Sequence, residues 1–166
     1  MKWITHISIG VGFTTLILHI TKGLEVNELI IVMLLSIIGS ILPDLYHPHL
    51  RRNLFLHSLI GCFVVSFLTS LGIGLTYYTL YEVDYRVIVD TTFKPIFTSY
   101  LLHLICDSMT AGGISPSYPI TRRKFRLLHL RYDDPVLNSV GVGIGLITLI
   151  FTIIMMGFEG KWVIPR

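Results

Sequence analysis

The chain has 166 residues, of which 52% are hydrophobic and only 14% are charged, and its mean hydropathy is +0.72. These values exclude an ordinary soluble domain and favour a single integral membrane domain covering residues 1–166. In a soluble protein the net charge of +3 and the pI of about 9.0 would suggest a nucleic-acid partner. In so apolar a chain the distribution of charge matters more than its sum, and no nucleic acid is expected.

Hydropathy predicts an all-α bundle of about five transmembrane helices. A helix needs roughly 20 apolar residues to cross the hydrocarbon core of a bilayer. The candidate spans are residues 3–20, 29–42, 54–81, 93–109 and 136–158. The fourth is the least apolar. Before it, the alternating segment VDYRVIVD (83–90) suggests a short hairpin or a strand-like excursion. The glycine-rich start of the fifth span suggests close helix packing.

Basic residues are divided unequally between the two sides of such a bundle. If the N-terminus is cytoplasmic, eight of the thirteen lie on the cytoplasmic side: Lys2, Arg51, Arg52, Arg122, Arg123, Lys124, Arg126 and Arg131. The positive-inside rule therefore predicts a multi-pass protein of the plasma (inner) membrane with a cytoplasmic N-terminus. Membrane lipids are its first expected partners.

Six residues with metal-binding side chains lie at the ends of predicted spans. They are His6, Asp44, His47, His57, His103 and Asp107. His103 and Asp107 are four residues apart and so share one face of a helix. In an up-down bundle all six reach the same cytoplasmic face, although more than a hundred residues separate the first from the last.

Imidazole and carboxylate groups are typical ligands of zinc and similar divalent ions, and a catalytic zinc site keeps three protein ligands plus a water. We therefore expect Asp44, His57, His103 and Asp107 to bind a divalent metal, with zinc as the first candidate. His6 and His47 are expected to act in catalysis, as proton carriers or further ligands. The alternative is a hydrogen-bonded structural plug. The remaining histidines are expected to be structural or solvated: His19, His49 and His129.

A basic run follows the fourth span. Its members, Arg122, Arg123, Lys124 and Arg126, are candidates for binding substrate phosphate. Anionic lipid headgroups or a purely topological role are the simpler alternatives. Cys62 and Cys106 lie inside apolar runs and indicate small buried side chains rather than a disulfide framework.

Several of these motifs together resemble a known family. They are Thr5-His6, GSILPDLYHP with Asp44 and His47, His57-Ser58, and YLLHLICDSMTAGGISPSYPI. The pattern resembles the YdjM-like family of inner-membrane, LexA-binding proteins described as metal-dependent hydrolases, over residues 6 to about 126. A more remote likeness, through the His-x-x-x-Asp pair and an N-terminal histidine, is to zinc-dependent phospholipase C, an all-helical phosphodiesterase.

The chain departs from the family pattern at two places. Tyr46 stands where members carry a second aspartate, and Arg52, Asn53 and Leu54 stand where a His-Arg-Gly run is expected. Two polar ligands of the family pattern are thus missing, which allows a one-metal or inactive variant.

The sequence as a whole predicts a membrane-bound metal-dependent hydrolase that acts on a phosphate ester or a phospholipid-like substrate. The alternative is a non-enzymatic membrane scaffold or regulatory protein that tethers a cytosolic partner. A transporter is less favoured, because the polar residues gather at one end and leave no path across the bilayer.

Overall fold

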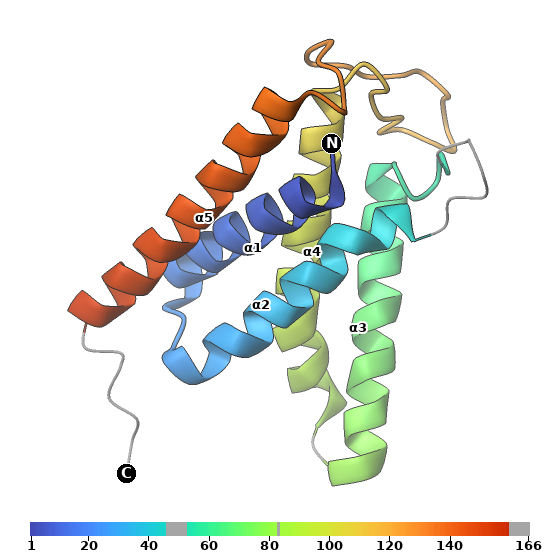
Figure 1. The fold of residues 1–166 in the computed structure, drawn as a ribbon. Helices are drawn as coiled ribbons and strands as arrows, with labels where there is room; N and C mark the ends of the chain where they lie inside the picture. Colours follow the sequence, from blue (N-terminus) through green and yellow to red (C-terminus); the bar gives the residue numbers. More distant parts are fainter. Residues whose placement is uncertain (46–52, 83, 160–166) are drawn as a thin grey trace.

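The structure, a computed structural model, describes residues 1–45, 53–82 and 84–159 (Figure 1). These ranges contain five long helices and the short 3-10 helix η1 (Leu42–Asp44). The long helices are α1 (Trp3–Lys22), α2 (Val26–Ile41), α3 (Leu59–Tyr81), α4 (Tyr85–Ser108) and α5 (Pro135–Phe158). In the same ranges strand-like pairing is limited to two isolated bridges, 110 with 130 and 114 with 125. The predicted all-α fold is confirmed.

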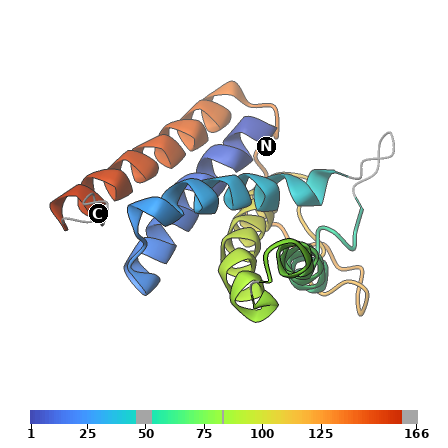
Figure 2. The same ribbon diagram turned by 90° about the horizontal axis from the view of Figure 1, so that it is seen from below.

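Helix α4 occupies the centre of the arrangement, because it packs against α1, α2 and α3, while α5 packs against α1. Figure 2 shows α3 and α4 nearly end-on while α1, α2 and α5 run across the view, so the two groups cross. The starts of α1, α3 and α5 and the ends of α2 and α4 lie at the same end of the molecule (Figure 1). The up-down topology expected from the sequence therefore gathers these five helix ends.

Four of the five helices are long and apolar enough to cross a membrane: α1, α2 together with η1, α3 and α5. Helix α4 is the exception to the five predicted spans. It carries Arg86 and Lys94 in its first half. Three neighbouring helices cover much of its surface, so less of α4 needs to be apolar than in a helix that faces lipid.

Two predicted helix boundaries were wrong, and in both cases a capping side chain explains the difference. Helix α3 begins at Leu59 rather than at 54, because the Ser58 hydroxyl accepts a hydrogen bond from the Gly61 amide. Helix α4 begins at Tyr85, where the Asp84 carboxylate accepts from the Arg86 amide. Residues 85–90 are therefore helical, and the predicted hairpin or strand-like excursion is absent there.

The prediction of close packing by the glycines of α5 is confirmed. A Cβ atom added to Gly12 of α1 would lie 2.2 Å from the carbonyl oxygen of Gly145, and one added to Gly145 would lie 2.3 Å from the carbonyl oxygen of Ser8. Only residues without a side chain allow the two backbones to approach this closely. This contact fixes α5 against the start of α1.

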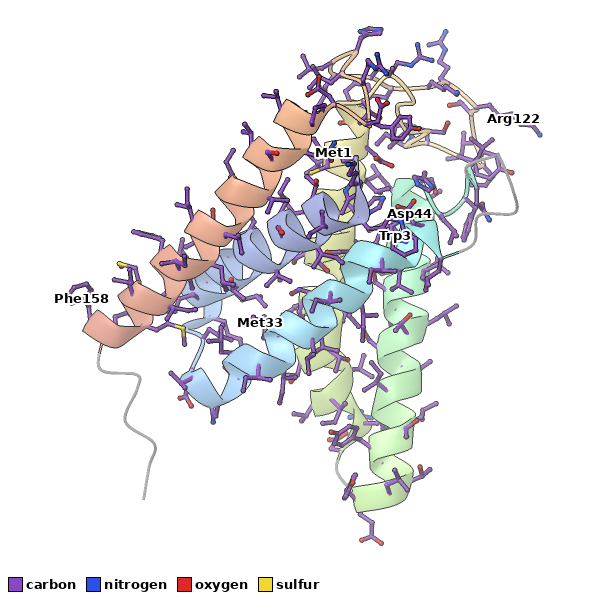
Figure 3. All side chains as sticks on the ribbon, viewed as in Figure 1. Met1, Trp3, Met33, Asp44, Arg122 and Phe158 are labelled. Carbon is purple, nitrogen blue, oxygen red and sulfur yellow. The ribbon has the colours of Figure 1, made fainter. Side chains whose placement is uncertain are left out.

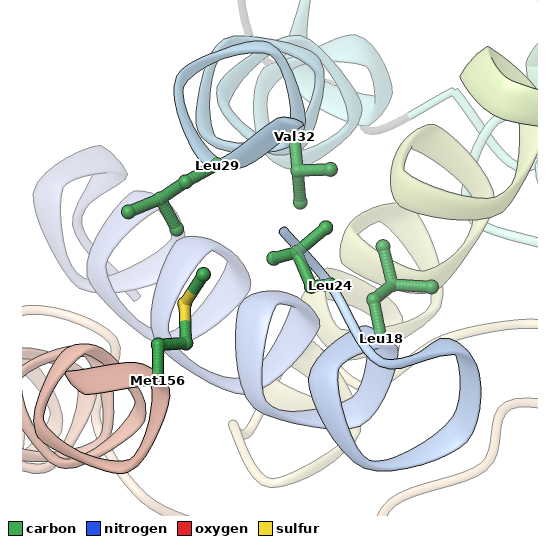
Figure 4. Close-up of a cluster of buried hydrophobic side chains, with 5 residues drawn as sticks. All are labelled: Leu18, Leu24, Leu29, Val32 and Met156. Atoms are coloured by element: carbon green, nitrogen blue, oxygen red, sulfur yellow. The ribbon is translucent and has the colours of Figure 1, made fainter. Parts of the chain in front are cut away.

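Two buried apolar clusters support the bundle. One joins the end of α1, the start of α2 and the end of α5, and consists of Leu18, Leu24, Leu29, Val32 and Met156 (Figure 4). The other lies between α3, α4 and the segment that follows α4, and consists of Cys62, Tyr100, Leu104 and Ile114. Both cysteines are free and buried, as predicted. The second cluster packs close to the polar end of the bundle, since the Tyr100 hydroxyl donates to the Leu56 carbonyl at 2.8 Å.

Candidate metal centre

The structure brings five of the six predicted residues together. His6 comes from the first turn of α1, Asp44 from η1, His57 from the turn before α3, and His103 and Asp107 from the last turns of α4. The three histidines and Asp107 are at most 2% exposed. The Asp44 side chain is 13% exposed and lies at the end of α2 (Figure 3). The sixth residue, His47, lies outside the described residues, as do Tyr46 and Arg52.

Two imidazole nitrogens and two carboxylate oxygens face one another at the spacing of a metal coordination shell. The Nε2 atom of His57 lies 3.4 Å from Asp44 Oδ1 and 3.5 Å from Asp107 Oδ2. The Nε2 atom of His103 lies 3.5 Å from Asp107 Oδ2 and 3.8 Å from Asp44 Oδ1. Ligands of a tetrahedral zinc ion with bonds of 2.0–2.1 Å are about 3.3 to 3.4 Å apart. The His–Asp distances are therefore close to those between ligands of one ion, and the ligand atoms of His57, His103 and Asp107 all lie within 4.8 Å of one another.

Backbone carbonyls orient both imidazole rings. The Nδ1 atom of His103 lies 2.8 Å from the Ser40 carbonyl oxygen, and Nδ1 of His57 lies 3.0 Å from the Asn53 carbonyl oxygen. A carbonyl oxygen can only accept, so each Nδ1 carries the hydrogen and each Nε2 faces the carboxylates. This is the arrangement in which metal-binding histidines are commonly held.

Either a proton on His57 or a bound metal ion can balance the negative charge of Asp44 and Asp107. Burial disfavours the charged form of His57, but hydrogen bonds to Asp107 and Asp44 outweigh burial and raise the pKa of His57 to about 9. The protonated ring then donates to the same carboxylates that would bind a cation. Metal binding requires a neutral imidazole, so the proton and the metal compete.

His6 contacts the other oxygen of Asp107. Its Nε2 atom lies 3.5 Å from Asp107 Oδ1, and its ring stacks on His103 with centroids 3.8 Å apart. The Met1 amino group lies 3.6 Å from the same oxygen. His6, Asp44 and His103 also offer ligand atoms within 4.8 Å of one another. Asp107 thus presents one oxygen to His57 and His103 and the other to His6.

The groups that orient the candidate ligands were not predicted from the sequence. Asn53 occupies one of the positions that depart from the family pattern, and its side-chain oxygen accepts from the Phe55 and Leu56 amides at 3.0 and 3.4 Å. That turn aims the Asn53 carbonyl at His57. At the end of α4 the Thr110 hydroxyl donates to the Asp107 carbonyl at 2.8 Å. A turn-forming asparagine is a recognisable signal, whereas a backbone carbonyl has none.

The other polar residues singled out in the sequence lie apart from this cluster. Arg122, Arg123, Lys124 and Arg126 are all exposed, in the segment between α4 and α5. Their role in binding phosphate stays a prediction. His19 is buried at the opposite end of α1, where its Nε2 atom lies 3.3 Å from Glu159 Oε1.

Membrane-length helices with a buried histidine and aspartate cluster at one end define an integral membrane protein with a candidate metal centre. The chain belongs to the YdjM inner membrane protein family, whose model matches residues 1–163. No curated protein and no solved structure matches the chain. The remote likeness to phospholipase C therefore gains no support.

Proposed function

We propose that this protein is a membrane-bound, metal-dependent hydrolase of phosphate esters, with zinc as the first candidate metal. The observation that carries the proposal is the set of four facing atoms from Asp44, His57, His103 and Asp107. Each of the two imidazole Nε2 atoms lies 3.4–3.8 Å from both carboxylate oxygens, and both imidazoles are oriented by backbone carbonyls. A hydrogen-bonded plug of protonated imidazoles would also place these nitrogens against the carboxylates, so the metal content of the purified protein separates the two.

A bound divalent ion would lower the pKa of a coordinated water to about 7 and polarise a phosphoryl oxygen. The chain's residues would supply the rest of the site. Asp44 is the most exposed member of the cluster, so substrate would approach past it. Asp107, His57 and His103 would hold the inner side of the site with their ring and carboxylate positions fixed.

His6 is suited to carry a proton. The Nδ1 atoms of His57 and His103 are hydrogen-bonded to backbone carbonyls. The buried Nδ1 atom of His6, in contrast, makes no hydrogen bond to any described residue. No carbonyl therefore fixes its tautomer, and either nitrogen can take up a proton. Its Nε2 atom reaches Asp107 through the oxygen that faces away from His57 and His103. We assign it proton transfer to the leaving group, with His47 as a further candidate.

The proposed orientation places the N-terminus and this centre at the cytoplasmic face. The support for it is the eight-to-five division of basic residues. A C-terminal alkaline phosphatase fusion should be active and a C-terminal green fluorescent fusion dark. The reverse result would invert the orientation but leave the helix ends on one side.

The depth of the cluster favours a second candidate function. Structural zinc sites are closed, and four of the five residues are at most 2% exposed. A metal-stabilised scaffold that tethers a cytosolic partner is therefore the alternative to the hydrolase.

One experiment distinguishes the two functions. The purified protein is analysed for bound metal and assayed with phosphodiester and phospholipid substrates, beside His103→Gln and the exposed-site control His129→Gln. The hydrolase predicts bound zinc and activity, both lost in His103→Gln and kept in His129→Gln. Bound metal without hydrolysis of any substrate would favour the scaffold, and a wild-type protein that binds no divalent metal would refute both.

A further inference from the structure

The segment between α4 and α5 contains a stretch, residues 120–132, that combines positive charge with exposed apolar side chains. We call it the amphiphilic loop. It has five basic residues and no acidic one: Arg122, Arg123, Lys124, Arg126 and Arg131. Arg131 is paired with Asp133, directly after the stretch, at 3.1 Å, so the four basic residues at 122–126 carry its charge. Its exposed large apolar side chains are Ile120 (80%), Phe125 (48%), Leu127 (56%), Leu128 (44%) and Tyr132 (64%). Charged and apolar groups thus alternate along one short exposed stretch.

The amphiphilic loop is tied to the residues that directly follow the metal ligand Asp107. Ile114 and Phe125 exchange two backbone hydrogen bonds, of 3.0 and 2.7 Å. The Leu127 amide donates to the Ser108 carbonyl at 2.7 Å, and the Leu130 amide donates to the Met109 carbonyl at 3.3 Å. These bonds hold the loop against the end of α4, so its position and that of Asp107 are coupled.

The approach between the two segments depends on a glycine. Gly113 has a φ of +62°, and a Cβ atom there would lie 2.6 Å from the Phe125 carbonyl oxygen. The loop lies at the same end of the molecule as the metal centre, and Arg122 projects at its outer edge (Figure 3). Its charged and apolar side chains therefore face outward near the ends of the membrane-length helices.

We propose that the amphiphilic loop anchors this end of the protein in an anionic lipid leaflet. Its arginines and lysine would contact lipid phosphates, and its apolar side chains would reach the boundary of the acyl chains. Charge complementarity selects an anionic surface. The apolar residues select a membrane over an acidic soluble partner, which would leave five large side chains in water.

The anchor also defines a substrate class for the protein, and this assignment rests on the proposed hydrolase function. Because the loop is bonded to residues 108–114, anchoring it at headgroup level places the metal centre close to the phosphodiester groups of lipids. The substrate is then a phospholipid presented by the leaflet rather than a water-soluble ester.

The test uses the full chain in nanodiscs of phosphatidylcholine alone or mixed with phosphatidylglycerol. A nitroxide at Leu128→Cys reports depth through its relative accessibility to oxygen and to a water-soluble nickel chelate. The buried Cys62 and Cys106 are controlled by labelling the wild type. The same measurement is made after neutralising Arg122, Arg123, Lys124 and Arg126 to glutamine. The control neutralises four cations outside the loop, Lys2, Lys22, Arg86 and Lys94.

The proposal predicts that the nitroxide is oxygen-accessible in the phosphatidylglycerol nanodiscs and water-accessible in the quadruple variant, while the control behaves like wild type. Each cation near an anionic surface is worth about fivefold in affinity. Four such cations multiply to about 600-fold when all of them contact the surface. Association with spin-labelled phosphatidylglycerol should therefore fall by between about tenfold, if only some of them do, and this limit in the quadruple variant. A water-accessible nitroxide in both lipid mixtures, or a depth unaffected by the four substitutions, would overturn the anchor.

Measurements of hydrolysis test the assignment of a phospholipid substrate separately. Hydrolysis of phosphatidylglycerol vesicles should fall by a larger factor in the quadruple variant than hydrolysis of a soluble phosphodiester in detergent. An equal loss on both substrates would overturn the phospholipid assignment. If the wild type hydrolyses neither substrate, the hydrolase proposal and the phospholipid assignment fail together. The depth of the nitroxide still tests whether the loop is anchored in the membrane.

Discussion

Asp107 is the residue on which the proposed metal centre depends most. Its Oδ2 atom lies 3.5 Å from the Nε2 atoms of both His57 and His103, and its Oδ1 atom lies 3.5 Å from Nε2 of His6. Asp107→Asn keeps the shape of the side chain but removes the negative charge and one acceptor oxygen. Loss of a group that only orients a ligand costs about 10- to 100-fold in metal affinity. Losing the ligand itself should therefore weaken zinc binding by more than about 100-fold.

Competition with a chromogenic zinc chelator measures this change in the detergent-solubilised protein. Circular dichroism should show an unchanged helix content, because the apolar clusters and the contact between α1 and α5 do not involve Asp107. His129→Gln, on the exposed loop, should bind zinc as the wild type does. A zinc affinity within threefold of wild type in folded Asp107→Asn would refute the assignment of this carboxylate.

Three further predictions follow from the same geometry and packing. His6→Gln should retain zinc but lower the hydrolysis rate by about 10²- to 10⁴-fold, the usual contribution of general acid–base catalysis, and unchanged turnover would exclude His6 from proton transfer. Because the pKa of His57 is raised to about 9 in the metal-free protein, zinc must displace a proton below that pH. Affinity should therefore rise with pH up to about 9, and calorimetry in buffers of different ionisation enthalpy should detect proton release; a pH-independent affinity would contradict this. Gly12→Val should destabilise the bundle by about 1 to 3 kcal/mol, because its side chain would meet the Gly145 backbone, whereas Gly143→Ala meets open space and should be neutral in thermal unfolding.

The gathering of these histidines and aspartates could be predicted from the sequence because topology, rather than local detail, brings them together. The i, i+4 spacing of His103 and Asp107 fixes their shared face on any helix. His6 and Asp44 lie at helix ends that an up-down bundle must place on one side. Hydropathy predicted that order of helices, although α4 is less apolar than the four helices that can cross a membrane.

Features that depend on backbone hydrogen bonds could not be predicted in the same way. The pattern around Val87 and Val89 suggests a strand, but the Asp84 cap and the packing of α4 against α3 make it helical. The carbonyls of Ser40 and Asn53 that orient the imidazoles carry no residue-specific signal. The pairing of Ile114 with Phe125, which ties the amphiphilic loop to α4, likewise appears only in three dimensions.

X-ray absorption at the zinc edge of the purified protein tests the central claim most directly. The proposed centre predicts a first shell of nitrogen and oxygen at about 2.0–2.1 Å, with outer-shell scattering from imidazole rings that weakens in His103→Gln. Among the described residues, neither Cys62 nor Cys106 belongs to a group of facing ligand atoms, so neither is expected to contribute. A sulfur shell near 2.3 Å, or a spectrum unchanged by His103→Gln, would contradict a metal centre built from these histidines and aspartates.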